Sequence, residues 1–375
     1  MALVPQTFDN SFNRKFLSML LPLRCLQNII FISSFTVDRS YIKAHSIWYH
    51  IVSFIFVITI MATRQIVAYK ADYYRHFSAL MKVFDFIVIN VLIFALTAFY
   101  FYSFIKRHEH VEMFLNLQKA FKRLNYKSYK RITIWYWIIV WYHFIYLIYC
   151  FITFTFIDYK VILVAVTVIY YEVHSTNVLS ILILIKEGII TWTSEFQCYG
   201  QVCLRVGDEE SKIHMKVLFQ VYVDLLKAFD LFKKTHHSII FILIVDIFAS
   251  TLLFVQTLIE IVNMSEEDLA YMMPINIAAL IWMFKKTMFV ITLSAQSEKL
   301  YMAFYEADAT CSNLLGVMQY IRDVKRLCKN LQRLNRAAFY KMRACHVFSI
   351  HGRLAQEFIS LVFGYVLVLL QLAIL

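Results

Sequence analysis

Seven apolar stretches, each long enough to cross a lipid bilayer, dominate this sequence. They lie at about 44–62, 83–105, 132–157, 161–185, 238–262, 274–293 and 358–375. A helix rises about 1.5 Å per residue, so about 20 residues cover the roughly 30 Å hydrocarbon core of a membrane. We therefore predict an all-α polytopic membrane protein with seven transmembrane helices.

The composition supports this class and argues against a soluble protein. Hydrophobic residues make up 61% of the chain, whereas a soluble domain usually holds about 45–50%. The chain has only six glycines and three prolines, so it carries little of the punctuation that loops and sheets need. The net charge of +12 would suggest nucleic acid in a soluble protein. Here basic cytoplasmic loops explain the charge, and we expect no nucleic-acid partner.

The distribution of lysine and arginine predicts the orientation in the membrane. Alternate connecting segments hold 30 basic residues on one side and five on the other. The rich side comprises the N-terminal segment 1–43, the loops 106–131 and 186–237, and the segment 294–357. The positive-inside rule then places the N-terminus in the cytoplasm and the C-terminus outside. Asn263 begins the one Asn-x-Ser/Thr triplet of the chain, lies on the predicted outer side, and is a candidate for glycosylation.

The predicted cytoplasmic segments carry helical patterns of their own. Apolar residues recur at three- and four-residue steps in 206–237 and again in 314–348, which predicts amphipathic helices packed beneath the membrane. Residues 106–131 also predict a basic amphipathic helix, which we place at the headgroup surface. The long segment 294–357 is thus expected to be mostly helical.

Several ionisable residues fall inside the predicted spans, where they cost free energy and tend to have a function. They are His143, Glu172, His174, Asp246, Lys285 and Lys286. Counted from the ends of the predicted spans at a helical rise of about 1.5 Å per residue, all of them lie near the middle of the membrane. Tyrosines and tryptophans crowd the same level of the third span, with Tyr142 and Tyr146 closest to His143.

Three hypotheses account for this set. The carboxylates pair with the lysines and lock the helices together. Alternatively, the polar and aromatic side chains line a cavity that admits a small-molecule ligand. A third hypothesis is a proton relay through His143, Glu172 and His174. The sequence alone leaves all three open.

No pattern in the sequence indicates catalysis. There is no glycine-rich phosphate loop, no serine nucleophile elbow and no His-Glu-x-x-His motif. Cys198 and Cys203, with His214 nearby, lack the spacing of a zinc site. We therefore expect a protein that is not an enzyme and that carries no cofactor and no metal.

The final helix carries a sequence pattern that resembles the insect gustatory receptors. Those receptors close with a Thr-Tyr pair, five apolar residues and a Gln-Phe pair. Here Gly364-Tyr365 is followed by five apolar residues and by Gln371-Leu372, so the Tyr and Gln match and the other two positions differ. Residues 311–315 (Cys-Ser-Asn-Leu-Leu) and 348–354 (Phe-Ser-Ile-His-Gly-Arg-Leu) are also similar to that family.

The resemblance implies a ligand-gated cation channel built from four subunits around one pore. It implies that the last helix lines the pore, with Gln371 at its narrow outer end and Leu367, Val368 and Gly364 on the same face. Tyr365 would pack against neighbouring helices. The helices of 206–237 and of 314–357, the latter within the segment 294–357, would form a cytoplasmic anchor between subunits.

The implied partners are a small-molecule tastant, membrane lipid and other gustatory receptor subunits in a homo- or heterotetramer. A bitter or otherwise aversive compound is the default ligand, and a sugar is the alternative. The implied location is the plasma membrane of chemosensory neurons. Two rivals remain: an odorant-receptor-type channel subunit and, from a different class, a secondary transporter. A transporter would need internal repeats and helices broken by Gly or Pro, which this sequence lacks.

Overall fold

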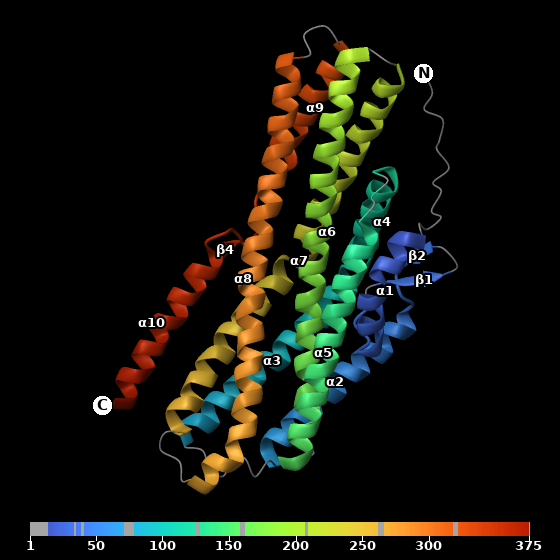
Figure 1. Ribbon diagram of the computed structural model, residues 1–375. Coiled ribbons are helices and arrows are strands. Elements are labelled where there is room, and N and C mark those ends of the chain that lie inside the picture. The colour runs from blue at the N-terminus through green and yellow to red at the C-terminus, as the bar shows by residue number, and fades with distance from the viewer. Residues whose placement is uncertain are drawn as a thin grey trace.

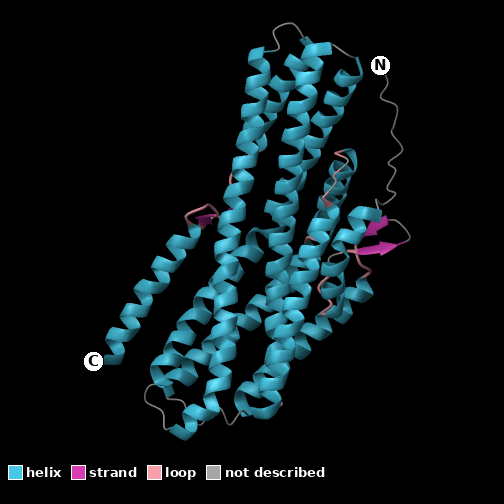
Figure 2. Ribbon diagram, in the orientation of Figure 1, coloured by secondary structure: helices cyan, strands magenta, loops and turns pink. Residues whose placement is uncertain are grey.

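The computed structural model describes residues 14–33, 35–38, 41–70, 79–124, 126, 128–157, 162–206, 209–261, 266–317 and 322–374. Most of these residues are helical (Figures 1 and 2). The helices are α1 (Arg14–Ile29), α2 (Ile47–Lys70), α3 (Ala79–Ile105), α4 (Arg107–Arg123), α5 (Tyr129–Ile157), α6 (Ile162–Val206), α7 (Glu209–Ile261), α8 (Glu266–Val317), α9 (Arg322–Ala338) and α10 (Leu354–Ile374). Two short antiparallel hairpins complete the described elements: β1 (Thr36–Asp38) with β2 (Tyr41–Lys43), and β3 (Arg343–Ala344) with β4 (Phe348–Ser349).

Each predicted span falls on a separate helix, namely α2, α3, α5, α6, α7, α8 and α10. Among the described residues, five of these helices contain a stretch long and apolar enough to cross a membrane: α5, α6, α7, α8 and α10. α2 and α3 contribute shorter apolar stretches, Ile47–Thr63 and Asn90–Ile105. The structure confirms the polytopic all-α membrane fold. The direction in which the chain crosses the membrane stays a prediction, and Asn263 lies outside the described residues.

Three helices are about twice as long as a membrane is thick. α6, α7 and α8 contain 45, 53 and 52 residues, which corresponds to about 70–80 Å. The hydrocarbon core accounts for roughly 30 Å of that length. α7 runs without a break from the amphipathic segment predicted at 206–237 into the span that follows it, and α8 continues beyond its predicted span as far as Val317.

The part of this bundle beyond the spans has a dense aromatic core. Trp192 of α6 donates its indole N–H to the carbonyl of Leu218 in α7, at 2.7 Å. Tyr222 of α7 donates its hydroxyl to Asn335 Oδ1 of α9, at 3.0 Å. The seven apolar residues that recur along 206–237 are all fully buried: Met215, Leu218, Val221, Tyr222, Leu225, Phe229 and Phe232. The predicted amphipathic face is thereby confirmed.

The predicted helix over 314–348 is correct only in part. α8 ends at Val317, α9 covers Arg322–Ala338, and the β3–β4 hairpin follows. Cys345 and His346 at the turn of this hairpin have φ values of 45° and 62°. The left-handed conformation is usually signalled by Gly, Asn or Asp, so this turn carried no sequence signal that we could use.

Protein, and not lipid, covers the apolar face of the basic segment 106–131, whereas its level relative to the headgroups stays a prediction. The segment does contain a helix, α4, but its apolar face is buried by protein. Met113, Leu117 and Phe121 are fully buried, and α4 packs mainly against α7. An amphipathic pattern identifies a face that must be covered, but it does not identify the cover.

α10 stands apart from the other long helices. It begins beside the middle of α8 and runs toward the end at which α7 finishes and α8 begins (Figure 1). It contacts α7 and α8. Much of its apolar surface is nevertheless exposed in the single chain, including Phe363, Leu367 and Val368.

Candidate functional site

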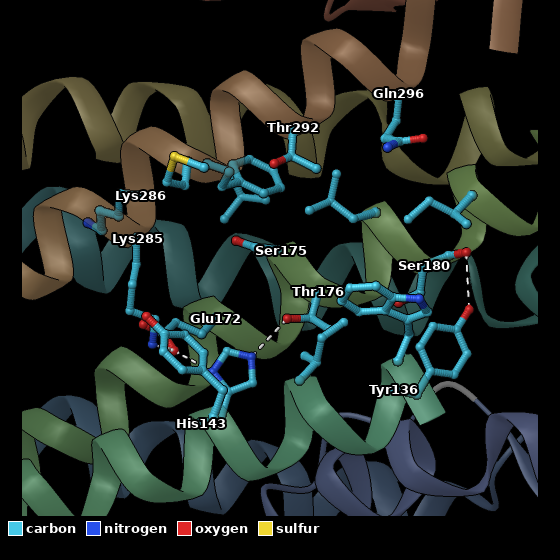
Figure 3. A pocket seen from close by; sticks show the side chains of 18 of the residues that line it. Tyr136, His143, Glu172, Ser175, Thr176, Ser180, Lys285, Lys286, Thr292 and Gln296 are labelled. Atoms are coloured by element: carbon cyan, nitrogen blue, oxygen red, sulfur yellow. Dashed lines mark hydrogen bonds and ion pairs between the residues drawn. The ribbon is translucent and has the colours of Figure 1, made fainter. Parts of the chain in front are cut away.

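A cleft of about 630 Å³ runs along α6 between α5 and α8. Its size falls within the range of small-molecule sites in proteins, about 300–1,000 Å³. Figure 3 shows side chains from α5, α6 and α8 converging on it, and α7 closes part of the floor through Leu243, Asp246 and Ile247. Six of the residues that the sequence singled out line this cleft: Tyr142, His143, Glu172, Asp246, Lys285 and Lys286.

At one end of the cleft, Glu172 of α6 joins α5 to α8. Its Oε2 atom lies 2.6 Å from His143 Nδ1 and accepts a hydrogen bond from the Lys285 ammonium. The other ring nitrogen of His143 lies 3.0 Å from Thr176 Oγ1. A neutral imidazole with its proton on Nδ1 donates to Glu172 and accepts from the threonine hydroxyl, which satisfies both contacts. In this arrangement Glu172 and Lys285 are the two charged residues among Glu172, His143, Thr176 and Lys285, and their charges are opposite.

The other oxygen of the Glu172 carboxylate is unsatisfied. Glu172 Oε1 is buried and has no hydrogen-bond partner among the described residues. A buried carboxylate oxygen without a donor costs free energy. The arrangement therefore leaves an unsatisfied buried acceptor on a residue that lines the end of the cleft.

Aromatic rings surround the Lys285 ammonium. Its Nζ lies 4.1 Å from the centre of the Tyr146 ring and 4.7 Å from that of Tyr142. Tyr146 also reaches α8 through its hydroxyl, which donates to the carbonyl of Ala278 at 3.4 Å. These cation–π contacts help to hold a charged lysine in an apolar environment.

The second lysine belongs to a separate pair. Lys286 Nζ lies 2.6 Å from Asp246 Oδ2 and 2.8 Å from Ser250 Oγ, so it joins α8 to α7. It also lies 3.7 Å from the centre of the Trp282 ring. Both charged side chains are buried, and Asp246 is only 2% exposed. The structure thus resolves the pairing that the sequence left open: Glu172 binds Lys285, and Asp246 binds Lys286.

His174 does not join this network. It lies in a second, very small cavity with Gln27, His110 and Asn177. Its ring packs 4.7 Å from that of Phe99, and its Nε2 has no partner among the described residues. Residues two positions apart on a helix point in different directions, so the spacing of Glu172 and His174 already argued against a shared site.

Several residues of the cleft were not predicted from the sequence. Thr176 stands one turn after Glu172 and binds the same histidine. Trp282 stands one turn before Lys286 and packs on its ammonium. Both could have been found from their spacing, because residues four apart share a helix face. Arg131, Lys186 and Gln296 line the far end of the cleft and carried no such signal.

The residues proposed for a pore lie on α10, away from the cleft. Gln371, Leu367, Val368 and Gly364 are all exposed, and a β-carbon added at Gly364 would meet nothing within 4 Å. Tyr365 is half exposed, and its ring stands 5.3 Å from that of Phe248 in α7. The four predicted pore residues therefore make few contacts within the single chain.

α8 holds the short segment that leads into α10. Ser294 Oγ lies 2.7 Å from the carbonyl oxygen of His351 and 2.9 Å from that of Gly352. The N–H of Gly352 donates to Glu298 Oε2 at 3.0 Å. Tyr301 donates its hydroxyl to the carbonyl of Ile350 at 2.9 Å. Three successive turns of α8 thus fix residues 350–352, and the first of these turns also carries Gln296, which lines the cleft.

Comparison with known proteins identifies the fold. No family model and no curated protein matches the sequence. Among solved structures, the insect olfactory receptor OR5 from Machilis hrabei in complex with eugenol superposes with a TM-score of 0.59, at 10% sequence identity over 96% of this chain and all of that one. A second structure of the same receptor gives a TM-score of 0.57 at 12% identity, with the same coverage. The chain therefore has the fold of an insect olfactory receptor.

Proposed function

We propose that this chain is a subunit of a ligand-gated cation channel of the gustatory-receptor type. It resides in the plasma membrane of chemosensory neurons, with its N-terminus in the cytoplasm and its C-terminus outside. The observation that carries the proposal is a cleft with a buried charged network inside a bundle that has the insect olfactory receptor fold. Tyr365 and Gln371, at the positions of the gustatory motif, support the gustatory branch.

The cleft favours an uncharged ligand that has a hydrogen-bond donor. Glu172 and Asp246 are each paired with a lysine, so a charged ligand would be buried without a counter-charge at considerable cost. Glu172 Oε1 offers an acceptor, and Trp282 Nε1 is a buried donor without a partner among the described residues. Tyr142 and Trp135 provide flat surfaces for stacking. A bitter or aversive small molecule is the default, and a sugar is the alternative.

The pore is assigned to α10 in an assembly of four subunits, either identical or mixed with other gustatory receptor subunits. Gln371 would face the outer end of the pore, with Leu367, Val368 and Gly364 on the same face. The exposed apolar surface of α10 supports this assignment, because such a surface needs a neighbouring helix or lipid to cover it.

α8 supplies the connection between ligand and pore. Lys285 faces the cleft, and Ser294 holds the segment that begins α10, about 14 Å further along the same helix. A ligand that displaces α8 by its contacts in the cleft therefore displaces the base of α10. Gating requires that the ligand make different contacts in the closed and open states, and α8 is the helix on which those contacts would change.

An odorant-receptor-type subunit is the second candidate, favoured by the likeness to an olfactory receptor. Such a subunit would need a co-receptor to pass current, and the cell type that expresses it would separate the two. The transporter hypothesis is weaker, since α5, α6, α7 and α8 are continuous helices where a transporter site would use broken ones.

The test is electrical. The chain is expressed in oocytes or cultured cells, alone and with gustatory receptor subunits, and a panel of uncharged tastants is applied. We expect ligand-evoked cation current without accumulation of labelled ligand. Accumulation of ligand without channel-like current would overturn the proposal in favour of a transporter.

Two substitutions then separate the cleft from the pore. Glu172→Gln should raise the ligand concentration for half-maximal current about fivefold, because the amide oxygen accepts a hydrogen bond about 1 kcal/mol weaker than that of a carboxylate; the comparison is made at matched surface level, since the change also breaks the ion pair with Lys285. Ser175→Ala is the matched control, since the Ser175 hydroxyl lines the cleft but donates to the carbonyl of Tyr171 within α6. Gln371→Ala should change ion selectivity or basal current, and unchanged current at normal surface levels would refute the pore assignment.

A further inference from the structure

The far end of the cleft differs in chemistry from the end that holds Glu172. Six residues with polar side chains gather there from three helices and the segment before α5: Tyr126 and Ser128 before α5, Arg131 in α5, Lys186 and Glu187 in α6, and Gln296 in α8. Lys186 donates to Gln296 Oε1 at 3.1 Å and lies 3.0 Å from Glu187 Oε1. Arg131 is exposed and forms no ion pair with any described residue. Two cations and one anion leave this end with one net positive charge.

The predicted spans indicate the level at which this polar end lies in the membrane. Arg131, Lys186 and Gln296 lie within three residues of the points at which spans three, four and six meet their cytoplasmic segments. These three points converge in the structure at one end of one cleft. The polar end therefore coincides with the headgroup level of the inner leaflet, if the chain crosses the membrane as its charges predict.

The length of the cleft corresponds to one leaflet. From Lys186 to Glu172 the cleft follows α6 for 14 residues, or about 21 Å. Half of the hydrocarbon core is roughly 15 Å thick. The cleft thus extends from the headgroups to just beyond the middle of the membrane. Between its two polar ends the lining is mainly apolar, with Ile139, Leu179 and Ile183 among the residues on its walls.

One side of the cleft is open along this length. Trp135 on the α5 wall is 57% exposed, and Phe284 and Met288 on the α8 wall are 66% and 42% exposed. α10, which carries the proposed pore, contacts α7 and α8 and lies on the other side of α8 from α5 (Figure 1). The open side therefore faces lipid, and acyl chains can enter it directly.

From these observations we propose that the cleft binds an anionic phospholipid of the inner leaflet. The phosphate lies between Arg131 and Lys186, the hydroxyl groups of Tyr126 and Ser128 donate to its oxygens, and one acyl chain lies along α6 toward Glu172. Arginine and lysine are the usual partners of phosphate. Basic pockets between transmembrane helices on the cytoplasmic side recur as sites for anionic headgroups. The headgroup and the proposed ligand occupy opposite ends of one cleft, and the acyl chain runs from one toward the other, so each shapes the space left for the other.

Photolabelling of the full-length protein tests this directly. The protein is reconstituted in phosphatidylcholine nanodiscs that contain a small fraction of phosphatidylserine with a diazirine at the end of one acyl chain. After illumination, labelled residues are mapped by mass spectrometry. We expect labelling near Tyr142 and Thr176 at the mid-membrane end of the cleft, well above that from phosphatidylcholine carrying the same diazirine.

Substitutions at the polar end provide the controls. Arg131→Gln should lower the cleft labelling about fivefold, and Arg131→Gln with Lys186→Gln about thirtyfold, because each basic residue near the surface contributes about one such factor. Lys130→Gln removes an exposed charge next to the site but not in it and should change nothing. Because Arg131 is exposed and forms no ion pair among the described residues, its substitution should leave folding intact.

Two outcomes would overturn the proposal. One is equal cleft labelling by the phosphatidylserine and phosphatidylcholine probes, which would show that the site does not select an anionic headgroup. The other is labelling by phosphatidylserine that Arg131→Gln and the double variant leave unchanged. Neither measurement depends on ligand-evoked current, so the lipid site can fail while the channel proposal stands, and the reverse.

Discussion

The buried pair of Asp246 and Lys286 allows a quantitative test of the packing between α7 and α8. Asp246→Asn keeps the shape of the side chain but removes the negative charge that lies beside the Lys286 ammonium, while its contacts with Ser250 and the Trp282 ring remain. Breaking a buried ion pair from one side costs about 3–5 kcal/mol. Asp246 is 2% exposed and its Oδ2 lies 2.6 Å from the lysine nitrogen, so the full effect applies. The ratio of folded to unfolded protein should fall by a factor of about 100 to several thousand.

A double-mutant cycle separates the pair from other effects. Lys286→Met alone should destabilise similarly, because it strands the carboxylate, whereas Asp246→Asn combined with Lys286→Met should recover most of the loss. The matched control is Glu112→Gln, which breaks the ion pair between Glu112 and Lys227. The two charged atoms of this pair are about as close as those of Asp246 and Lys286, but both side chains are about half exposed. That change should cost no more than about 1 kcal/mol.

The assay measures surface level in cells and the thermal midpoint of the detergent-solubilised protein by fluorescence-detected gel filtration. A stability loss of 1–2 kcal/mol already changes cellular abundance several-fold, so Asp246→Asn should fall well below the Glu112→Gln control in both. If Asp246→Asn matched that control in surface level and midpoint, the pair would have to be hydrated. The argument from burial would then be refuted.

Three further predictions follow from other parts of the chain. Ser294→Ala should reduce maximal ligand-evoked current with little change in the ligand concentration for half-maximal response, because it releases the base of α10 and leaves the cleft intact. Gly188→Ala should destabilise the protein by about 1–3 kcal/mol, because the added β-carbon would lie 2.7 Å from a methyl group of the buried Leu225. The matched control is Gly316→Ala, whose added β-carbon meets nothing within 4 Å, so this change should be neutral or slightly stabilising. Burial in α4 lowers the pKa of His110 from 6.5 to about 4, so the stability that its neutral ring provides should be present above pH 6.5 and be lost as the pH falls toward 4.

Each of these has a contrary result that is simple to recognise. Equal losses of maximal current and of apparent affinity in Ser294→Ala would place the serine in binding and not in coupling. Equal thermal midpoints for the two glycine variants would mean that the α6–α7 contact yields easily. A His110→Leu variant that keeps the acid sensitivity of the native chain would show that another group titrates, such as the neighbouring buried His236, whose ring lies 5.0 Å from that of His110.

The sequence was sufficient for the class of fold because the bilayer imposes length and hydrophobicity on each span. The set of buried charges was also visible, since charges inside spans are rare. Their partners were not visible. Lys285 and Lys286 are neighbours in sequence but point about 100° apart on a helix, and one faces α6 while the other faces α7. Only the arrangement of the helices decides which carboxylate each one meets.

The errors have a common physical origin. The pattern of α4 showed that one face must be buried, and we assigned the cover to lipid where the structure supplies α7. The β3–β4 hairpin was missed because its left-handed turn uses Cys345 and His346, two residues that give no turn signal. The polar end of the cleft was missed because Arg131, Lys186 and Gln296 come from three separate helices, and none stands out along the chain.

The adjacency of Lys285 and Lys286 restricts how α8 can move. Each lysine ties α8 to a different neighbour, through Glu172 of α6 and through Asp246 of α7. A turn of α8 about its own axis would break both ion pairs at once and strand four charges in an apolar setting. A tilt or a slide of α8 together with α6 and α7 would keep them. The two neighbouring charges therefore oppose rotation of α8, and in the proposed channel α8 would tilt or shift along its axis together with α6 and α7.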